Sequence, residues 1–100
     1  MYDMNNLAKL NNMEGLAPEA FRGFMAFDQA AFRGKAIPLK YKELMAVAVA
    51  LTTQCPYCIA LHSKRAKEAG ASEPEIAETV LVAAALRAGG AVTHGTHALA

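Results

Sequence analysis

The sequence lacks tryptophan, contains only two cysteines, and has no excess of charge of either sign. With ten basic and nine acidic residues the formal net charge is +1, which gives no indication of a nucleic-acid-binding surface. Residues 1–7 lack the apolar segment of a secretory signal, and no stretch approaches the 18 apolar residues of a membrane helix. We therefore expect a cytoplasmic protein without a nucleic-acid or membrane partner.

Internal repeats, low-complexity tracts and linkers are also missing, so residues 1–100 are expected to form one domain. The chain is 54% apolar, and much of that fraction is alanine. One small core cannot hide so much apolar surface, because a chain of this length buries only about two-thirds of its unfolded surface. The composition therefore favours a homo-oligomer over the alternative, a tightly packed alanine-rich monomer.

Apolar periodicity, with proline and glycine as boundary signals, predicts an all-α fold of about five to six helices. The expected segments are a short helix ended by Gly15, helices over 18–34, 38–51, 56–70 and 72–88, and a last short segment over 91–99. Ser72 and Glu75 form the pattern of a capping box, and Gly89-Gly90 is expected to stop the helix that follows it.

Two of these helices carry distinctive apolar patterns. Residues 44–51 are apolar on every side, which predicts a fully buried helix. The helix over 18–34 carries apolar residues at intervals of three and four, which we expect to lie in the core, with the lining of a substrate pocket as the alternative. Those residues are Phe21, Phe24, Met25 and Phe32.

The two cysteines, Cys55 and Cys58, begin the helix over 56–70, and His62 follows one turn later. At about 100° per residue, Cys58 lies roughly 60° around the helix from Cys55, with His62 between them. In an antiparallel helix pair, Glu43 lies roughly 13 Å back from the turn and His62 roughly 10 Å beyond it, so the two side chains are nearly level. The spacing indicates a working dithiol beside a base rather than a structural disulfide.

Each residue of this group has an expected chemical role. A carboxylate such as Glu43 orients a neighbouring imidazole and increases its basicity, so His62 can accept a proton from Cys58. Cys55 lies at a helix N-terminus, where the helix dipole favours a thiolate. Glu43 is the only charged residue of an otherwise apolar run, and a buried carboxylate requires a partner.

Other interpretations of the same residues remain. The cysteines could be inert buried thiols, and Glu43 could be an exposed residue of a first helical turn. A zinc ion could be bound by Cys55, Cys58 and His62, with His94 or Glu43 as a fourth ligand. A c-type haem site is excluded, because a histidine does not directly follow Cys58. His94 and His97 are interpreted as polar positions near an exposed C-terminus, or else as groups near the site.

The pattern Glu43-x11-Cys55-x2-Cys58-x3-His62, together with the alanine-rich helix before it, resembles the alkylhydroperoxidase D-like branch of the carboxymuconolactone decarboxylase superfamily. The resemblance covers roughly residues 38–98. Members of this branch are all-helical trimers or hexamers whose dithiol reduces hydroperoxides, with the Glu and His as a proton relay. Full-length members carry a histidine where this chain has Tyr57, so one proton donor is absent here.

The resemblance implies a thiol-dependent peroxidase or disulfide oxidoreductase. No metal or cofactor is expected, because the zinc ligand set is incomplete and a proton relay accounts for His62 without a metal. Glu43 and His62 would form the relay, Cys58 would react with the peroxide, and Cys55 would be the resolving thiol. The implied partners are a hydroperoxide substrate, a dithiol reductant of lipoyl type, and further copies of the chain in a hexamer or trimer. A non-catalytic redox sensor and a zinc-binding module are the alternatives.

Overall fold

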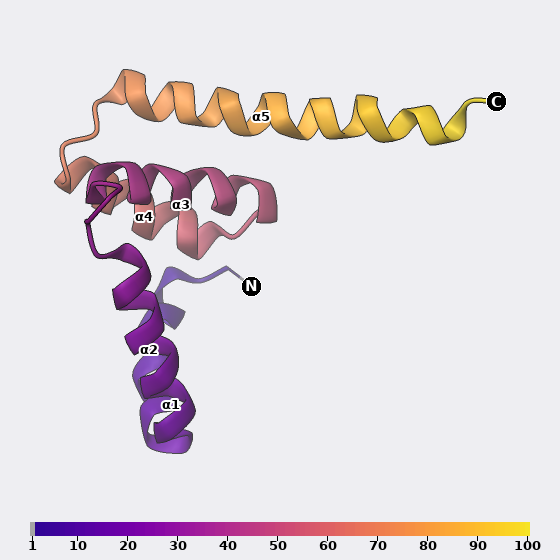
Figure 1. The fold of residues 1–100 in the computed structure, drawn as a ribbon. Helices are drawn as coiled ribbons and strands as arrows, with labels where there is room; N and C mark the ends of the chain where they lie inside the picture. The colour runs from indigo at the N-terminus through magenta and orange to yellow at the C-terminus, as the bar shows by residue number, and fades with distance from the viewer. Residues whose placement is uncertain (1) are drawn as a thin grey trace.

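Helices make up nearly all of the computed structural model, which describes residues 2–100 (Figure 1). The elements in chain order are the 3-10 helix η1 (Met4–Lys9), the α-helices α1 (Leu10–Leu16), α2 (Pro18–Phe32), α3 (Leu39–Thr53), α4 (Pro56–Glu68) and α5 (Glu73–Gly95), and the 3-10 helix η2 (Thr96–Ala98). The described residues contain no strand, so the all-α expectation is confirmed.

Helices α3 and α4 form an antiparallel hairpin whose turn is encoded by three consecutive residues. Gln54 ends α3 in the left-handed conformation, at φ 56°, and its backbone N–H donates to the carbonyl of Ala50. Cys55 then provides the N-cap of α4, and Pro56 occupies the first helical turn, where its missing N–H costs nothing. This tight turn places the cysteines at one end of the hairpin.

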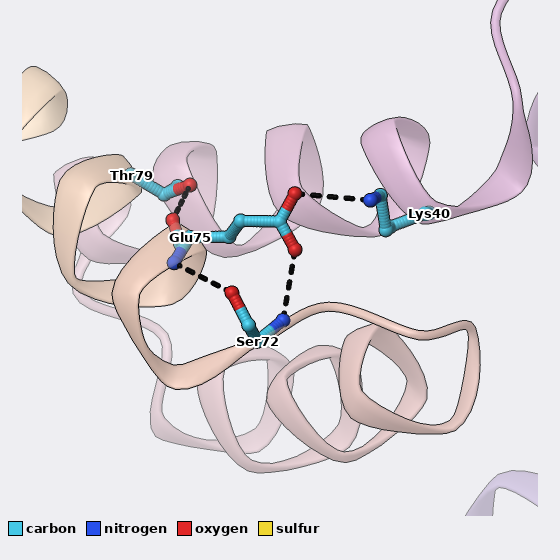
Figure 2. Close-up of polar contacts among 4 residues, drawn as sticks. All are labelled: Lys40, Ser72, Glu75 and Thr79. Atoms are coloured by element: carbon cyan, nitrogen blue, oxygen red, sulfur yellow. Dashed lines mark hydrogen bonds and ion pairs between the residues drawn. The ribbon is translucent and has the colours of Figure 1, made fainter.

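Helix α5 begins at the predicted capping box. The Glu75 backbone N–H donates to the Ser72 hydroxyl, and the Ser72 backbone N–H donates to the Glu75 carboxylate (Figure 2). The same carboxylate accepts a hydrogen bond from Lys40 of α3 at 2.9 Å, which ties the start of α5 to the hairpin. The Ser72 backbone N–H and the Lys40 ammonium together lower the pKa of Glu75.

The chain has an open shape. Helix α5 runs along α3 and extends well past the hairpin, whereas the α1–α2 pair stands away from it (Figure 1). A small core of Leu44, Ala66 and Ala71, with Ile76 packed against it, joins α3, α4 and the start of α5. The radius of gyration is 16.7 Å, whereas a compact domain of this length has about 13 Å. The elements that hold the site are therefore packed together, and the two ends of the chain are not.

Two predicted helix ends are wrong. Helix α1 continues through Gly15 to Leu16, and α5 continues through Gly89 and Gly90 to Gly95, so no separate segment begins at residue 91. An interior glycine costs a helix about 1 kcal/mol relative to alanine, but it keeps its backbone N–H and carbonyl. A glycine therefore weakens a helix without ending it, so it is a poor stop signal by itself.

The continuity of α5 also corrects the expectation that no stretch of the chain is long and apolar enough for a membrane helix. From Glu73 to Ala98 the chain forms a 26-residue helical segment that is long and apolar enough to cross a membrane by length and composition. Only 6% of the most apolar 18-residue stretch of this segment is buried within the chain. The prediction had divided this segment at the glycine pair and so underestimated its length.

The expectations about burial are also corrected. Helix α3 is buried on one side, at Leu44, Val47 and Ala50, but Met45 and Val49 of the same helix are 46% and 60% exposed. Helix α2 has no buried residue at all, so its apolar stripe does not form a core within the subunit. In both helices the apolar pattern is real, but the single chain does not supply the surface that would cover it.

Candidate active site

The two thiols meet at the N-terminus of α4. Cys55 and Cys58 are free, and their Sγ atoms lie 2.8 Å apart. The backbone N–H of Cys58 also donates to the Cys55 sulfur at 3.4 Å. Cys55 itself precedes the helix, with φ −98° and ψ 102°. The prediction that all three residues share one helical face is therefore right for Cys58 and His62 and wrong for Cys55. The N-cap geometry nevertheless brings the two sulfurs into contact.

The contact shifts the pKa values of the two thiols in opposite directions. The Cys58 thiol donates to Cys55, and this hydrogen bond, with the backbone N–H groups of Cys58 and Tyr57, lowers the pKa of Cys55. The same hydrogen bond, burial and the negative charge of Cys55 raise the pKa of Cys58 to about 11. When this pair of thiols loses one proton, the negative charge therefore resides on Cys55 and the remaining proton on Cys58.

The predicted carboxylate–imidazole pair is present. The Nδ1 atom of His62 lies 2.6 Å from Oε1 of Glu43, across the contact between α4 and α3. The side chains are 13% and 4% exposed, so the pair is largely shielded from water. Glu43 thus has the partner that its burial requires. With Nδ1 engaged by Glu43, the other ring nitrogen, Nε2, remains for proton exchange.

A cavity of about 410 Å³ adjoins this pair. Cys58 and His62 both line it, and most of its remaining wall is apolar, contributed by α2 and α3. Its volume lies within the usual range for small-molecule pockets, roughly 300–1,000 Å³. The cavity therefore brings the Cys58 thiol and the His62 imidazole to one space that an organic molecule can enter.

One residue of the site was assigned mainly to the core in the sequence analysis. Phe32, the last residue of α2, stacks on the His62 ring with centroids 5.1 Å apart and planes inclined by 7°, and it lines the cavity. Phe32 therefore lines a cavity instead of a core within the chain, and the binding of a substrate there stays a prediction. Its position at the end of the apolar stripe, directly before a predicted helix stop, was the available signal.

The N-terminal segment contacts Tyr57. The side-chain amide of Asn6 donates to the Tyr57 hydroxyl at 3.1 Å, and the ring of Tyr2 contacts Tyr57 edge-to-face, with centroids 5.9 Å apart. Tyr57 lies between the two cysteines in sequence. Residues of η1 therefore contact the tetrapeptide that holds both thiols.

The zinc alternative lacks a ligand set in residues 2–100, where no three His, Cys, Asp or Glu side chains are grouped closely enough to hold a metal ion. His94, in the last turn of α5, and His97, in η2, contact each other with ring centroids 5.8 Å apart, and both are exposed. They are not part of the site.

The hydrogen bond between the thiols predicts how a substitution changes the alkylation of Cys55. Cys58→Ala removes the side-chain donor and should raise the pKa of Cys55, whereas Cys58→Ser keeps a donor and should leave it closer to that of the wild type. Rates of alkylation followed from pH 5 to 10 should show the midpoint for Cys58→Ala shifted to higher pH. Identical midpoints in the two variants would show that the side-chain bond does not hold the charge on Cys55.

Comparison with known proteins identifies relatives of the chain. A protein from Paracoccus denitrificans, described as uncharacterized protein 4 in cox locus, is 46% identical over 77 residues, which are 77% of this chain and 69% of that protein. An uncharacterized protein from Cupriavidus necator is 30% identical over 91 residues, which are 91% of this chain and 78% of the relative.

A solved structure and a family profile agree with these matches. The crystal structure of apo-lpg0406, a carboxymuconolactone decarboxylase family protein from Legionella pneumophila, superposes with a TM-score of 0.78 and 34% sequence identity, over 82% of this chain and 73% of that one. The profile of the carboxymuconolactone decarboxylase family matches residues 18–100, which include α2 to α5 and the whole dithiol site. The chain therefore belongs to the carboxymuconolactone decarboxylase family.

Proposed function

We propose that the protein is a thiol-dependent peroxidase or disulfide oxidoreductase of the alkylhydroperoxidase D-like branch of this family. The observation that carries the proposal is the contact of 2.8 Å between Cys55 and Cys58 beside a cavity that Cys58 shares with His62. A dithiol at this separation needs little movement to form a disulfide. The largely buried Glu43–His62 pair reaches the same cavity through His62 and can exchange a proton there.

In the proposed reaction, a hydroperoxide enters the cavity and meets Cys58. The Cys58 proton passes to His62, and the sulfur attacks the terminal peroxide oxygen. The O–O bond breaks, an alcohol leaves with the proton from His62, and Cys58 becomes a sulfenic acid. The Cys55 thiolate then attacks the Cys58 sulfur, so that a disulfide forms and hydroxide leaves as water after taking up a proton.

A dithiol reductant completes the cycle. It transfers two electrons and two protons to the disulfide, restores both thiols, and becomes a disulfide itself. Because the pKa of Cys55 is lowered, its sulfur is the better leaving group, so the reductant thiolate attacks the Cys58 sulfur and Cys55 leaves as a thiolate. The second thiol of the reductant then displaces Cys58 from the mixed disulfide. The family resemblance favours a lipoyl-type dithiol. The proposed setting is cytoplasmic, with no metal or cofactor and no nucleic-acid or membrane partner.

A turnover assay tests this proposal. Purified protein is reduced, mixed with one equivalent of cumene hydroperoxide, and examined by mass spectrometry. It should lose two hydrogen atoms and both reactive thiols. With excess dihydrolipoamide it should consume hydroperoxide continuously, whereas Cys58→Ser should not exceed the rate without protein. Disulfide formation without continuous turnover for any of several peroxides and dithiols would instead indicate a redox sensor, and the absence of both would reject dithiol chemistry.

A further inference from the structure

Two consecutive residues of α3 make different contacts close to the site, one with His62 and the other with the end of α2. Glu43 binds the edge of the His62 ring at Nδ1. Its neighbour Lys42 points toward the end of α2, where its ammonium donates to the carbonyls of Ala31 and Arg33 at 2.8 Å and 2.7 Å. Those two carbonyls flank Phe32, the residue stacked on the face of His62.

Lys42 supplies what the end of α2 otherwise lacks. The last carbonyls of a helix have no partner within the helix, and a lysine ammonium satisfies them and complements the helix dipole. Helix α2 has no buried residue, so apolar packing contributes little to its attachment to the hairpin. The two hydrogen bonds from Lys42 are therefore a principal attachment of the α2 terminus to α3.

We propose that Lys42 is a positioning residue, which anchors the end of α2 so that Phe32 holds the His62 ring in the orientation that presents Nε2 to the cavity. The proposal rests on the proposed function, because it assigns the ring a proton to carry. Glu43 fixes one edge of the His62 ring, at Nδ1, but the ring can still turn about that hydrogen bond. Phe32, stacked nearly parallel, removes that rotation and covers one face of the ring from water.

The orientation of the ring can be measured without any reaction. The protein contains three histidines, His62, His94 and His97, so the histidine ring spectrum in NMR holds few signals. A phenylalanine stacked on His62 shifts the ring protons of that residue upfield. In Phe32→Leu and in Lys42→Met this shift should be lost, while the ring protons of His94 and His97 keep their wild-type positions. Lys42→Arg, which can still donate to both carbonyls, should retain it.

The kinetic consequence is measured on the same variants. A misplacement of a catalytic group by about 1 Å can cost roughly 100-fold in rate, so we expect the oxidation of the dithiol by cumene hydroperoxide to slow by about tenfold or more in Lys42→Met. Lys42→Arg should restore most of the rate. Lys64→Met, at an exposed position on α4, is the matched control and should match the wild type in both measurements.

The two measurements separate this inference from the proposed function. An unchanged His62 spectrum in both Lys42→Met and Phe32→Leu would overturn it, whether or not the protein reduces peroxides. A changed spectrum with a wild-type oxidation rate would also overturn it, because the ring orientation would then have no catalytic consequence. Circular dichroism establishes that each variant is folded, and Phe32→Leu serves as the second test if Lys42→Met is not.

Discussion

Replacing His62 by phenylalanine should slow the oxidation of the dithiol by hydroperoxide by about 10²–10⁴-fold, the usual contribution of a general base. The physical reason is the raised pKa of Cys58, about 11, which leaves this thiol protonated at neutral pH. Without an imidazole beside it, the proton has to leave unaided before the sulfur can attack. Glu43→Gln keeps the shape of the side chain but removes its charge, so we expect a smaller loss, near the lower end of that range.

Single-turnover oxidation, followed by thiol loss after rapid mixing, measures this effect directly. Alkylation of Cys55 provides an internal control, because its thiolate character depends first on Cys58 and not on the relay. Glu14→Gln, an exposed carboxylate on α1, is the matched control variant. Wild-type oxidation rates in both His62→Phe and Glu43→Gln would show that the pair is structural.

The protein should be a homo-oligomer in solution, and we propose a hexamer, with a trimer as the alternative. The isolated subunit exposes 7426 Å², about 1,900 Å² more than the roughly 5,500 Å² typical of a compact monomer of its mass. A standard interface covers about 800 Å² per partner, so the excess is enough for more than one neighbour. Much of it is apolar, including Val82 and Leu86 of α5, which are 64% and 74% exposed.

Light scattering coupled to gel filtration tests this assembly at micromolar concentration. Leu86→Glu should lower the mass, because it places a charge on the apolar face of α5, whereas Lys64→Glu at an exposed polar position should not. A mass near 10.6 kDa would contradict assembly, and a mass of two or three chains would contradict the hexamer alone. A monomer that sediments with phospholipid vesicles would show that a membrane, rather than other copies, covers α5.

The site was largely predictable because its geometry is local or nearly so. Cys58 and His62 are one helical turn apart, and the length of a hairpin fixes Glu43 opposite His62. Phe32 was assigned to a pocket only as an alternative, and Lys42 was not assigned to the site, because the positions of both depend on how the end of α2 docks on α3. That docking is set by side-chain hydrogen bonds to backbone carbonyls, which leave no periodic signal in a sequence.

The helix starts were predicted well and the degree of burial was not. Ser72 and Glu75 form a capping box that is complete within four residues, and Pro18 and Pro56 begin helices as expected. Apolar periodicity, in contrast, indicates which surface avoids water but not which chain covers it. For this reason α2 and the exposed side of α3 were assigned to a core that the single subunit does not contain.

The weak attachment of α2 to the hairpin affects how water reaches the site. Segments with few buried contacts open locally at a far smaller free-energy cost than global unfolding, and their amides exchange with solvent hydrogen correspondingly faster. In the isolated subunit α1 and α2 have no buried residue, whereas α3 and α4 contribute to the core. The face of His62 that Phe32 covers is therefore protected by the part of the chain that opens at the smallest free-energy cost, and water reaches that face when α2 opens locally. The Glu43–His62 hydrogen bond joins α3 to α4, so breaking it requires the hairpin itself to open.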